Sequence, residues 1–153
     1  MKIVVLIVLI FSSSLIKAQT NYIPTGTWKY IEGKDTIEFL LKPSQIKVVD
    51  TTYPILFGFH KYIRNGVLVE SSMNDANTDY ADHKYTILIY NVHADDVKNT
   101  GDFEDLSWCV KRLIYLTKTT ATTMNVRLTS MQVSKNINGY GYTLPRTFQL
   151  VKQ

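Results

Sequence analysis

The sequence is poor in cysteine: Cys109 is the one thiol in 153 residues. A chain with one thiol forms no internal disulfide, so its stability has to come from packing. Cys109 lies between Trp108 and Val110, and we expect it to be a buried small hydrophobe, because free cysteines are usually buried and inert. A nucleophile or an intermolecular link is the alternative for this thiol.

Motifs for metal binding and catalysis are also absent. The sequence contains no H-x-x-x-H, C-x-x-C, G-x-S-x-G or phosphate-binding glycine loop. His83 and His93 flank a predicted strand, which would separate them by roughly 33 Å and prevent a shared zinc ion. His60 lies within a strand-like segment, where we expect a bond to a neighbour rather than action as a base. We therefore expect no cofactor, no metal and no enzymatic activity.

Acidic residues gather in one predicted loop, residues 93–105. The candidate oxygen ligands for calcium in this loop are Asp95, Asp96, Asn99, Asp102, Glu104 and Asp105. Their spacing does not match an EF-hand, because Val97 stands where a second ligand is needed. A solvated loop is the expectation, with calcium binding left open. The strand acids Glu38 and Glu70 alternate with outward-facing neighbours, which does not favour a pair of catalytic carboxylates.

One long apolar run exists, and it lies at the start of the chain. Lys2 precedes an unbroken apolar segment at residues 3–11, and the small residue Ala18 follows three serines and a second short apolar segment. This order is typical of a secretory signal peptide cleaved after Ala18. The run is too short for a transmembrane anchor, which needs about 20 apolar residues. We therefore expect a secreted or periplasmic protein with no stable membrane span after cleavage.

Cleavage would leave residues 19–153, which we expect to form a single domain. Loss of Lys2 and Lys17 lowers the number of basic residues from 17 to 15, against 13 acidic residues. The remaining basic residues are scattered along the sequence. This pattern does not support nucleic-acid binding.

The clearest structural signal is a β-hairpin at residues 54–73, with Asn65-Gly66 as a two-residue turn. This dipeptide tolerates the two positive φ angles of a type I′ turn. The turn predicts four cross-strand pairs: Arg64 with Val67, Ile63 with Leu68, Tyr62 with Val69, and Lys61 with Glu70. Apolar residues on both faces of this hairpin predict a wall that is covered on both sides.

Seven further segments have the composition or alternation of strands, and turn residues separate them. They are residues 26–31, 36–42, 46–49, 85–92, 106–116, 122–128 and 146–152. Pro43-Ser44 is expected to break the second of these, and residues 74–84 to form a polar loop. Asp105 could instead cap a short helix. The pattern predicts an all-β antiparallel meander barrel, with a β-sandwich as the alternative.

Two parts of the chain resemble the lipocalin-like (calycin) barrels. Gly26-Thr27-Trp28 is similar to the glycine–any–tryptophan signature of that family's first strand, and residues 115–128 and 148–152 resemble its closing strands. The resemblance implies that Trp28 caps one end of the barrel, under a basic residue, either Arg146 or Arg127, in a cation–π contact. The whole layout also resembles small secreted bacterial proteins of unknown function.

Two functions suit these observations. The first is burial of a small apolar or amphipathic ligand inside the barrel. Its speculative lining residues are Phe39, Phe57, Phe59, Tyr85, Ile87 and Tyr115. The second is a protein–protein interaction module of the cell envelope, acting through a sheet face or edge.

Overall fold

The computed structural model describes residues 24–92, 98–130 and 141–153. The predicted signal peptide, residues 1–18, lies outside this part of the chain. The elements are β1 (Gly26–Glu32), β2 (Asp35–Val48), β3 (Thr51–Arg64), β4 (Val67–Ser71), the single-turn 3₁₀ helices η1 (Met73–Asp75) and η2 (Tyr80–Asp82), β5 (Ile87–Asn91), β6 (Lys98–Asp105), β7 (Val110–Lys118), β8 (Thr123–Ser130) and β9 (Thr147–Lys152). No helix in the described ranges is long and apolar enough to cross a membrane.

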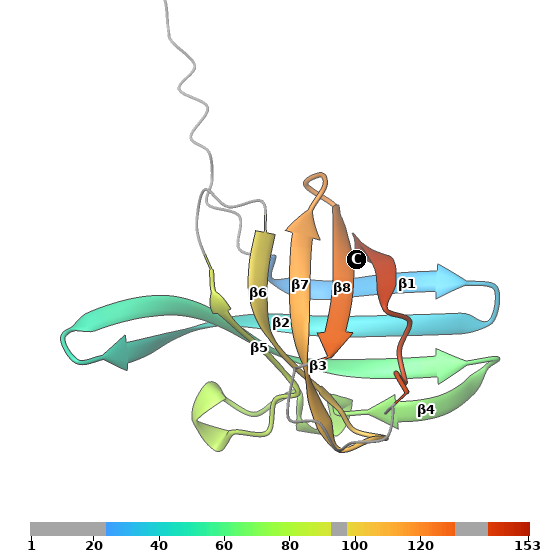
Figure 1. Cartoon of the computed structure of the whole chain (residues 1–153), viewed down its shortest axis with the longest axis horizontal. Coiled ribbons are helices and arrows are strands. Elements are labelled where there is room, and N and C mark those ends of the chain that lie inside the picture. The colour runs from blue at the N-terminus through green and yellow to red at the C-terminus, as the bar shows by residue number, and fades with distance from the viewer. Residues whose placement is uncertain (1–23, 93–97, 131–140) are drawn as a thin grey trace, which may run out of the picture.

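Eight of the strands close into an antiparallel barrel (Figure 1). Their order around the barrel is β1-β2-β3-β5-β6-β7-β8-β9, and β9 returns to pair with β1 through Trp28 and Lys152. Each strand pairs with the one before it in the chain except β5, which pairs with β3 because β4 lies outside the closed ring. The predicted meander barrel is therefore confirmed, and the sandwich alternative does not apply.

The hairpin of β3 and β4 forms at Asn65-Gly66, as predicted. Both residues have positive φ angles, 52° and 79°. The first two predicted pairs are present, but a β-bulge between Tyr62 and Ile63 changes the rest. Tyr62 pairs with Glu70, and Lys61 with Ser71, so the predicted pairs of Tyr62 with Val69 and Lys61 with Glu70 are wrong. The bulge inserts one residue and so turns Glu70 to the barrel interior.

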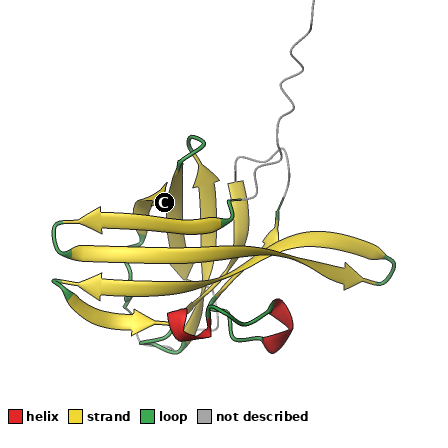
Figure 2. Cartoon of the chain, turned by 180° about the vertical axis from the view of Figure 1, so that it is seen from behind, coloured by secondary structure: helices red, strands yellow, loops and turns green. Residues whose placement is uncertain are grey.

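Strands β2 and β3 are longer than predicted, and their far ends form a two-stranded ribbon beyond the barrel (Figure 2). The predicted break at Pro43 does not occur: Pro43 pairs with Leu56 and the strand continues to Val48. Beyond Leu41, β3 is the only described strand that pairs with β2, because the pairing with β1 ends there. Proline is tolerated at such an edge, where one side of the strand has no partner.

Part of the predicted acidic loop is strand β6. Its odd-numbered residues face inward, namely Asn99, Gly101, Phe103 and Asp105. A Cβ at Gly101 would lie 2.0 Å from the Leu88 carbonyl oxygen, so only glycine permits this approach of β5 to β6. The strand places Asn99 and Asp105 on the opposite face from Asp102 and Glu104, so these four do not form one ligand cluster.

The barrel interior is filled by side chains from all eight strands. The buried cluster comprises Trp28, Ile37, Phe39, Leu41, Leu56, Tyr62, Ile87, Ile89, Phe103, Ile114, Leu116, Met124, Val126, Leu128, Leu144, Phe148 and Leu150. The ring of Phe39 on β2 lies 6.2 Å from that of Phe103 on β6 and 5.8 Å from that of Phe148 on β9. These strands are not neighbours, so the rings meet across the lumen and close it at this level. Eight strands leave an interior of the width that side chains can fill.

Residues 72–86, which include η1 and η2, lie against the outer face of β3. Phe57 contacts Tyr80 and Tyr85, with ring centroids 5.9 and 6.1 Å apart. Lys42 donates hydrogen bonds to the carbonyl oxygens of Ala76 and Thr78, which ties this segment to β2. The wall is therefore covered on both sides at β3, as its apolar residues predict.

Two expectations near residue 109 are corrected. The strand predicted to start at residue 106 starts at Val110, because residues 106–109 form a turn whose Trp108 N–H bonds Asp105 Oδ1 at 3.3 Å. Asp105 thus caps a turn and not a helix. Cys109 is exposed and has a φ of 52°, so the expectation that it is buried is wrong.

The basic residue over Trp28 also differs from the expectation. Trp28 is fully buried and its indole N–H bonds the Pro24 carbonyl oxygen. Lys152 Nζ lies 5.9 Å from the centroid of its ring. The Arg146 guanidinium lies instead over Tyr142, at 4.5 Å. Lys152 takes the position because β9 pairs with β1 at this residue.

Candidate functional site

The most organised polar cluster in the described structure centres on His60, which is fully buried in β3. Its Nε2 lies 2.9 Å from Glu70 Oε1, and its Nδ1 lies 2.8 Å from Thr86 Oγ1. The β-bulge that turns Glu70 inward makes the first contact, since the unbulged register would have placed Glu70 opposite the outward-facing Lys61. The second contact comes from the residue that precedes β5.

Two serines complete this cluster. Ser72 Oγ lies 2.9 Å from Thr86 Oγ1 and accepts a hydrogen bond from the backbone N–H of His60. Ser107 donates two hydrogen bonds to Glu70 Oε2, from its backbone N–H at 2.9 Å and from its hydroxyl at 2.7 Å. Both carboxylate oxygens and both imidazole nitrogens therefore have partners, which buried polar groups require.

These contacts change the pKa of Glu70. Burial acts to raise the pKa, but hydrogen bonds from His60 and Ser107 and the charge of the imidazole act against it. The net effect holds the pKa of Glu70 below its ordinary value. The carboxylate is therefore stabilised in its ionised form inside the barrel.

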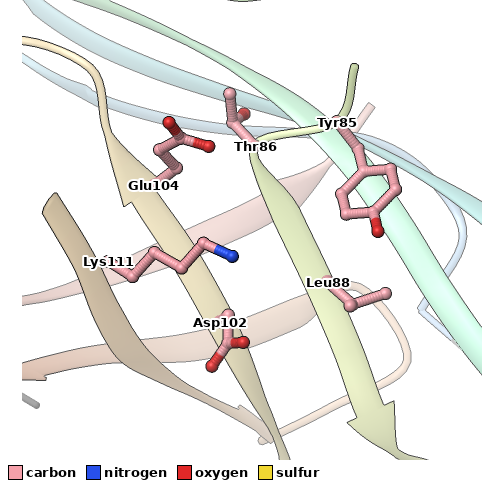
Figure 3. A pocket seen from close by; sticks show the side chains of 6 residues that line it. All are labelled: Tyr85, Thr86, Leu88, Asp102, Glu104 and Lys111. Atoms are coloured by element: carbon pink, nitrogen blue, oxygen red, sulfur yellow. The ribbon is translucent and has the colours of Figure 1, made fainter. Parts of the chain in front are cut away.

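Thr86, His60 and Glu70 follow the order of a hydroxyl, a base and an orienting acid. The pocket next to Thr86 on the outer wall has a volume of about 60 Å³, and its lining is shown in Figure 3. A pocket of this size has room for only a few water molecules. Within the described residues, the cluster is a buried hydrogen-bond network beside a small pocket.

A second buried charged cluster lies where β6 ends and β7 begins. Asp105 Oδ2 lies 3.6 Å from Arg112 Nε, and both Asp105 oxygens accept hydrogen bonds from Thr143. Arg112 also bonds the Gly141 carbonyl oxygen and lies over the ring of Tyr142. This network holds residues 141–144 against the barrel, where Leu144 joins the core.

The six speculative lining residues do not share a cavity. Phe39 and Ile87 belong to the buried cluster inside the barrel. Phe57 and Tyr85 contact each other on the outer face of β3, and Phe59 also contacts Phe57. Tyr115 lies on the outer wall, where the Lys98 ammonium group contacts the face of its ring. They are separated because successive side chains of a strand point to opposite faces, so some of these residues face the interior and others face outward.

The described residues also line surface grooves that are larger than the Thr86 pocket. One of about 370 Å³ lies at the root of the ribbon, between β2 and residues 79–81. Two others, of about 480 and 360 Å³, follow β8 and β9. The ribbon itself exposes Ile46, Val48, Val49 and Tyr53, by 36, 51, 85 and 48 %. Sequence reasoning missed this ribbon surface because it ended β2 at Pro43.

The fold and its buried clusters define a small, side-chain-filled, antiparallel β-barrel protein. Residues 1–104 match the model of a family of unknown function, DUF6705, and the chain belongs to this family. The matched segment extends to β6 and includes His60, Glu70 and Thr86. No curated protein and no solved structure matches the chain. The likeness to lipocalin-like barrels and the secreted location of the protein remain predictions.

Proposed function

We propose that this protein is an exported, non-catalytic β-barrel that binds another protein through the β2–β3 ribbon, defined here as residues 42–55. The observation that carries the proposal is the exposure of Ile46, Val48, Val49 and Tyr53 on an element that projects from a filled barrel. A filled lumen leaves the ligand-binding alternative without a cavity at the level of Phe39. The outer surface is then where binding takes place.

The geometry of the ribbon supports a contact face. Ile46 pairs directly with Tyr53, so both side chains lie on one face. Val48 and Ile55 extend this face toward the tip and toward the barrel. The result is an apolar stripe along one side of the ribbon, continuous with the buried outer layer at Phe57.

The tip adds a second argument. Val49 is a β-branched residue with a φ of 55°, at the first of the two positions between β2 and β3. Glycine is favoured at such a position, and a β-branched residue is strained there. Val49 is both strained and exposed, which stability does not explain. Contact with a partner does, because strain of this kind concentrates at functional positions.

The partner is a protein rather than a lipid surface, because the ribbon has two strand edges without a partner among the described residues. Within that part of the chain, residues 42–48 of β2 and residues 51–55 of β3 pair only with each other. Entry into lipid would leave these backbone groups unsatisfied, at a cost of several kcal/mol each. An extended segment of a partner protein satisfies them by adding a strand.

Site-specific photo-crosslinking in the producing cell tests the proposal. A photoreactive phenylalanine analogue at Tyr53 should give one defined protein adduct, whereas the same group at Val151, an exposed residue on β9, should not. The purified partner should then bind the chain, and Ile46→Ser should weaken binding by about tenfold, because it removes an apolar anchor. Ile31→Ser is the matched control, since Ile31 is an exposed isoleucine on β1.

Three results would overturn the proposal. Equal cross-linking from Tyr53 and Val151 would show that the ribbon is not a specific contact. Equal loss of binding in Ile46→Ser and Ile31→Ser would show the same. Binding of the wild-type chain, but not of Ile46→Ser, to neutral phosphatidylcholine vesicles would favour a lipid surface.

A further inference from the structure

The outer wall formed by β6, β7, β8 and β9 carries a row of cationic and aromatic side chains. Lys98 Nζ lies 4.6 Å from the centroid of the Tyr115 ring. Tyr115 pairs with Arg127 on β8, and Arg127 pairs with Thr147 on β9, next to Arg146. We call Lys98, Tyr115, Arg127, Tyr142 and Arg146 the basic strip. Three of these residues come from β6, β7 and β8, and the other two from the segment before β9, which explains why the basic residues look scattered in the sequence.

Two grooves follow this strip. The first, of about 480 Å³, and the second, of about 360 Å³, share Arg127 and Thr147, so they adjoin. Their remaining polar lining is hydroxyl or amide apart from Arg146: Thr117, Asn125, Thr129, Ser130 and Tyr142. No carboxylate occurs among the described residues that line them. The grooves therefore combine positive charge with neutral hydrogen-bonding groups.

The two arginines are available to a ligand. Arg127 and Arg146 are exposed, and neither forms an ion pair within the described ranges. The opposite side of the barrel differs, since Lys29 and Lys61 both pair with Glu38. Arg146 is also held in place, because it lies over Tyr142, whose hydroxyl is 2.9 Å from Ser130 Oγ. A preorganised guanidinium loses little entropy when it binds an anion.

We propose that the basic strip binds an acidic polysaccharide. Guanidinium groups bind carboxylates through paired, charge-assisted hydrogen bonds, and Arg127 and Arg146 supply two of them along one groove. The threonine, serine and asparagine side chains that line the grooves suit sugar hydroxyls. The choice of a polysaccharide over a nucleic acid rests on the export part of the proposed function. The surface itself is separate from the β2–β3 ribbon.

Binding of defined polymers to the full mature chain tests this inference. Polygalacturonate is the acidic probe, neutral dextran is the uncharged probe, and a single-stranded oligonucleotide of equal charge is the third. We expect polygalacturonate to bind at low salt, dextran not to bind, and the oligonucleotide to bind more weakly than polygalacturonate. Calorimetry at two salt concentrations measures all three, since charge-driven binding weakens with salt.

Variants locate the site. Arg127→Gln and Arg146→Gln should each raise the Kd for polygalacturonate by about tenfold, the loss expected for one charge-assisted contact. Lys47→Gln removes an exposed charge from the ribbon and should change the Kd less than twofold. Arg127→Lys should recover only part of the affinity, because lysine cannot form the paired contact. These surface changes should leave the unfolding midpoint of the chain unchanged.

Several results would overturn the inference. Absence of polygalacturonate binding at low salt would do so, as would an equal loss in Lys47→Gln, which would show attraction by net charge alone. Tighter binding of the oligonucleotide would point to a nucleic acid and contradict the polysaccharide. Because the ribbon does not contribute to this site, cross-linking through Tyr53 can succeed or fail independently.

Discussion

The His60 cluster and the tip of the β2–β3 ribbon follow opposite rules. Inside the barrel, both nitrogens of His60 and both oxygens of Glu70 have hydrogen-bond partners. At the ribbon, a strained valine and other apolar side chains face solvent, beside strand edges that no described strand pairs with. The first arrangement is what a stable fold requires. The second lowers stability, and local rules are usually broken in this way at functional positions.

The largest expected effect comes from removing the acid at the centre of the cluster. Glu70→Ala leaves His60 Nε2 and the Ser107 N–H without their partner inside the protein, and should lower the free energy of unfolding by about 3 kcal/mol. Urea unfolding measures this change. Glu38→Ala is the control, since Glu38 pairs with two lysines on the outer wall, where we expect a loss below about 1 kcal/mol. Similar losses in the two variants would contradict a special role for the interior cluster.

A change at Gly101 should have the next largest effect. Gly101→Ala forces β6 away from the Leu88 carbonyl oxygen and should cost about 2 kcal/mol of unfolding free energy. Thr100→Ala, at the neighbouring outward position, should cost less than about 0.5 kcal/mol. Thermal or urea unfolding of the two variants provides the measurement. Equal stability of Gly101→Ala and Thr100→Ala would contradict the prediction that close packing of β5 on β6 requires glycine at this position.

Acid should weaken the same cluster in a defined pH range. The pKa of Glu70 is lower in the folded chain than its ordinary value of 4.5, which is the value expected when the chain is unfolded. The ionised carboxylate therefore contributes its full stabilisation above that value, and the contribution is lost as the pH falls through the folded-state pKa. Urea midpoints measured from pH 7 down to pH 3 should fall less steeply for Glu70→Gln than for the wild type. Parallel curves would contradict this prediction.

The smallest expected change has the opposite sign. Val49→Gly removes a β-branched residue from a left-handed conformation that costs roughly 1–2 kcal/mol. Glycine offsets part of this gain, because it loses more conformational entropy on folding. We expect a net gain of about 0.5 kcal/mol in unfolding free energy, together with weaker partner binding. Val151→Gly, in a regular strand, should instead lose about 0.5–1 kcal/mol. Unfolding curves for both variants test the comparison, and a loss in Val49→Gly would remove the argument from strain.

The fold class could be predicted from the sequence because its signals are local. Alternation marks most strands, and Asn65-Gly66 marks one turn without ambiguity. The turn at Val49 could not be predicted, because valine is unfavourable at positive φ. Strand β6 was missed because its inward positions carry Asn99, Gly101 and Asp105, which resemble loop residues and face inward only after β5 and β7 pair with it.

The candidate sites were less predictable than the fold, for a related reason. Glu70 meets His60 through a bulge, and nothing in the sequence of β4 specifies where the extra residue falls. The contact of Ser107 with Glu70 joins residues 37 apart in the chain. The basic strip depends on the register of β6, β7 and β8 and on the segment that precedes β9. Such contacts follow from long-range pairing and leave no mark in any short stretch of sequence.

The pairing of Trp28 with Lys152 means that the first and last strands are each other's neighbours. The barrel therefore cannot close before β9 has been synthesised and can pair with β1. Until then β1 lacks one of its two partners, and folding must wait for a contact between the most distant parts of the sequence, which is slow. This requirement keeps the polypeptide unfolded for longer than pairing between sequence neighbours alone would.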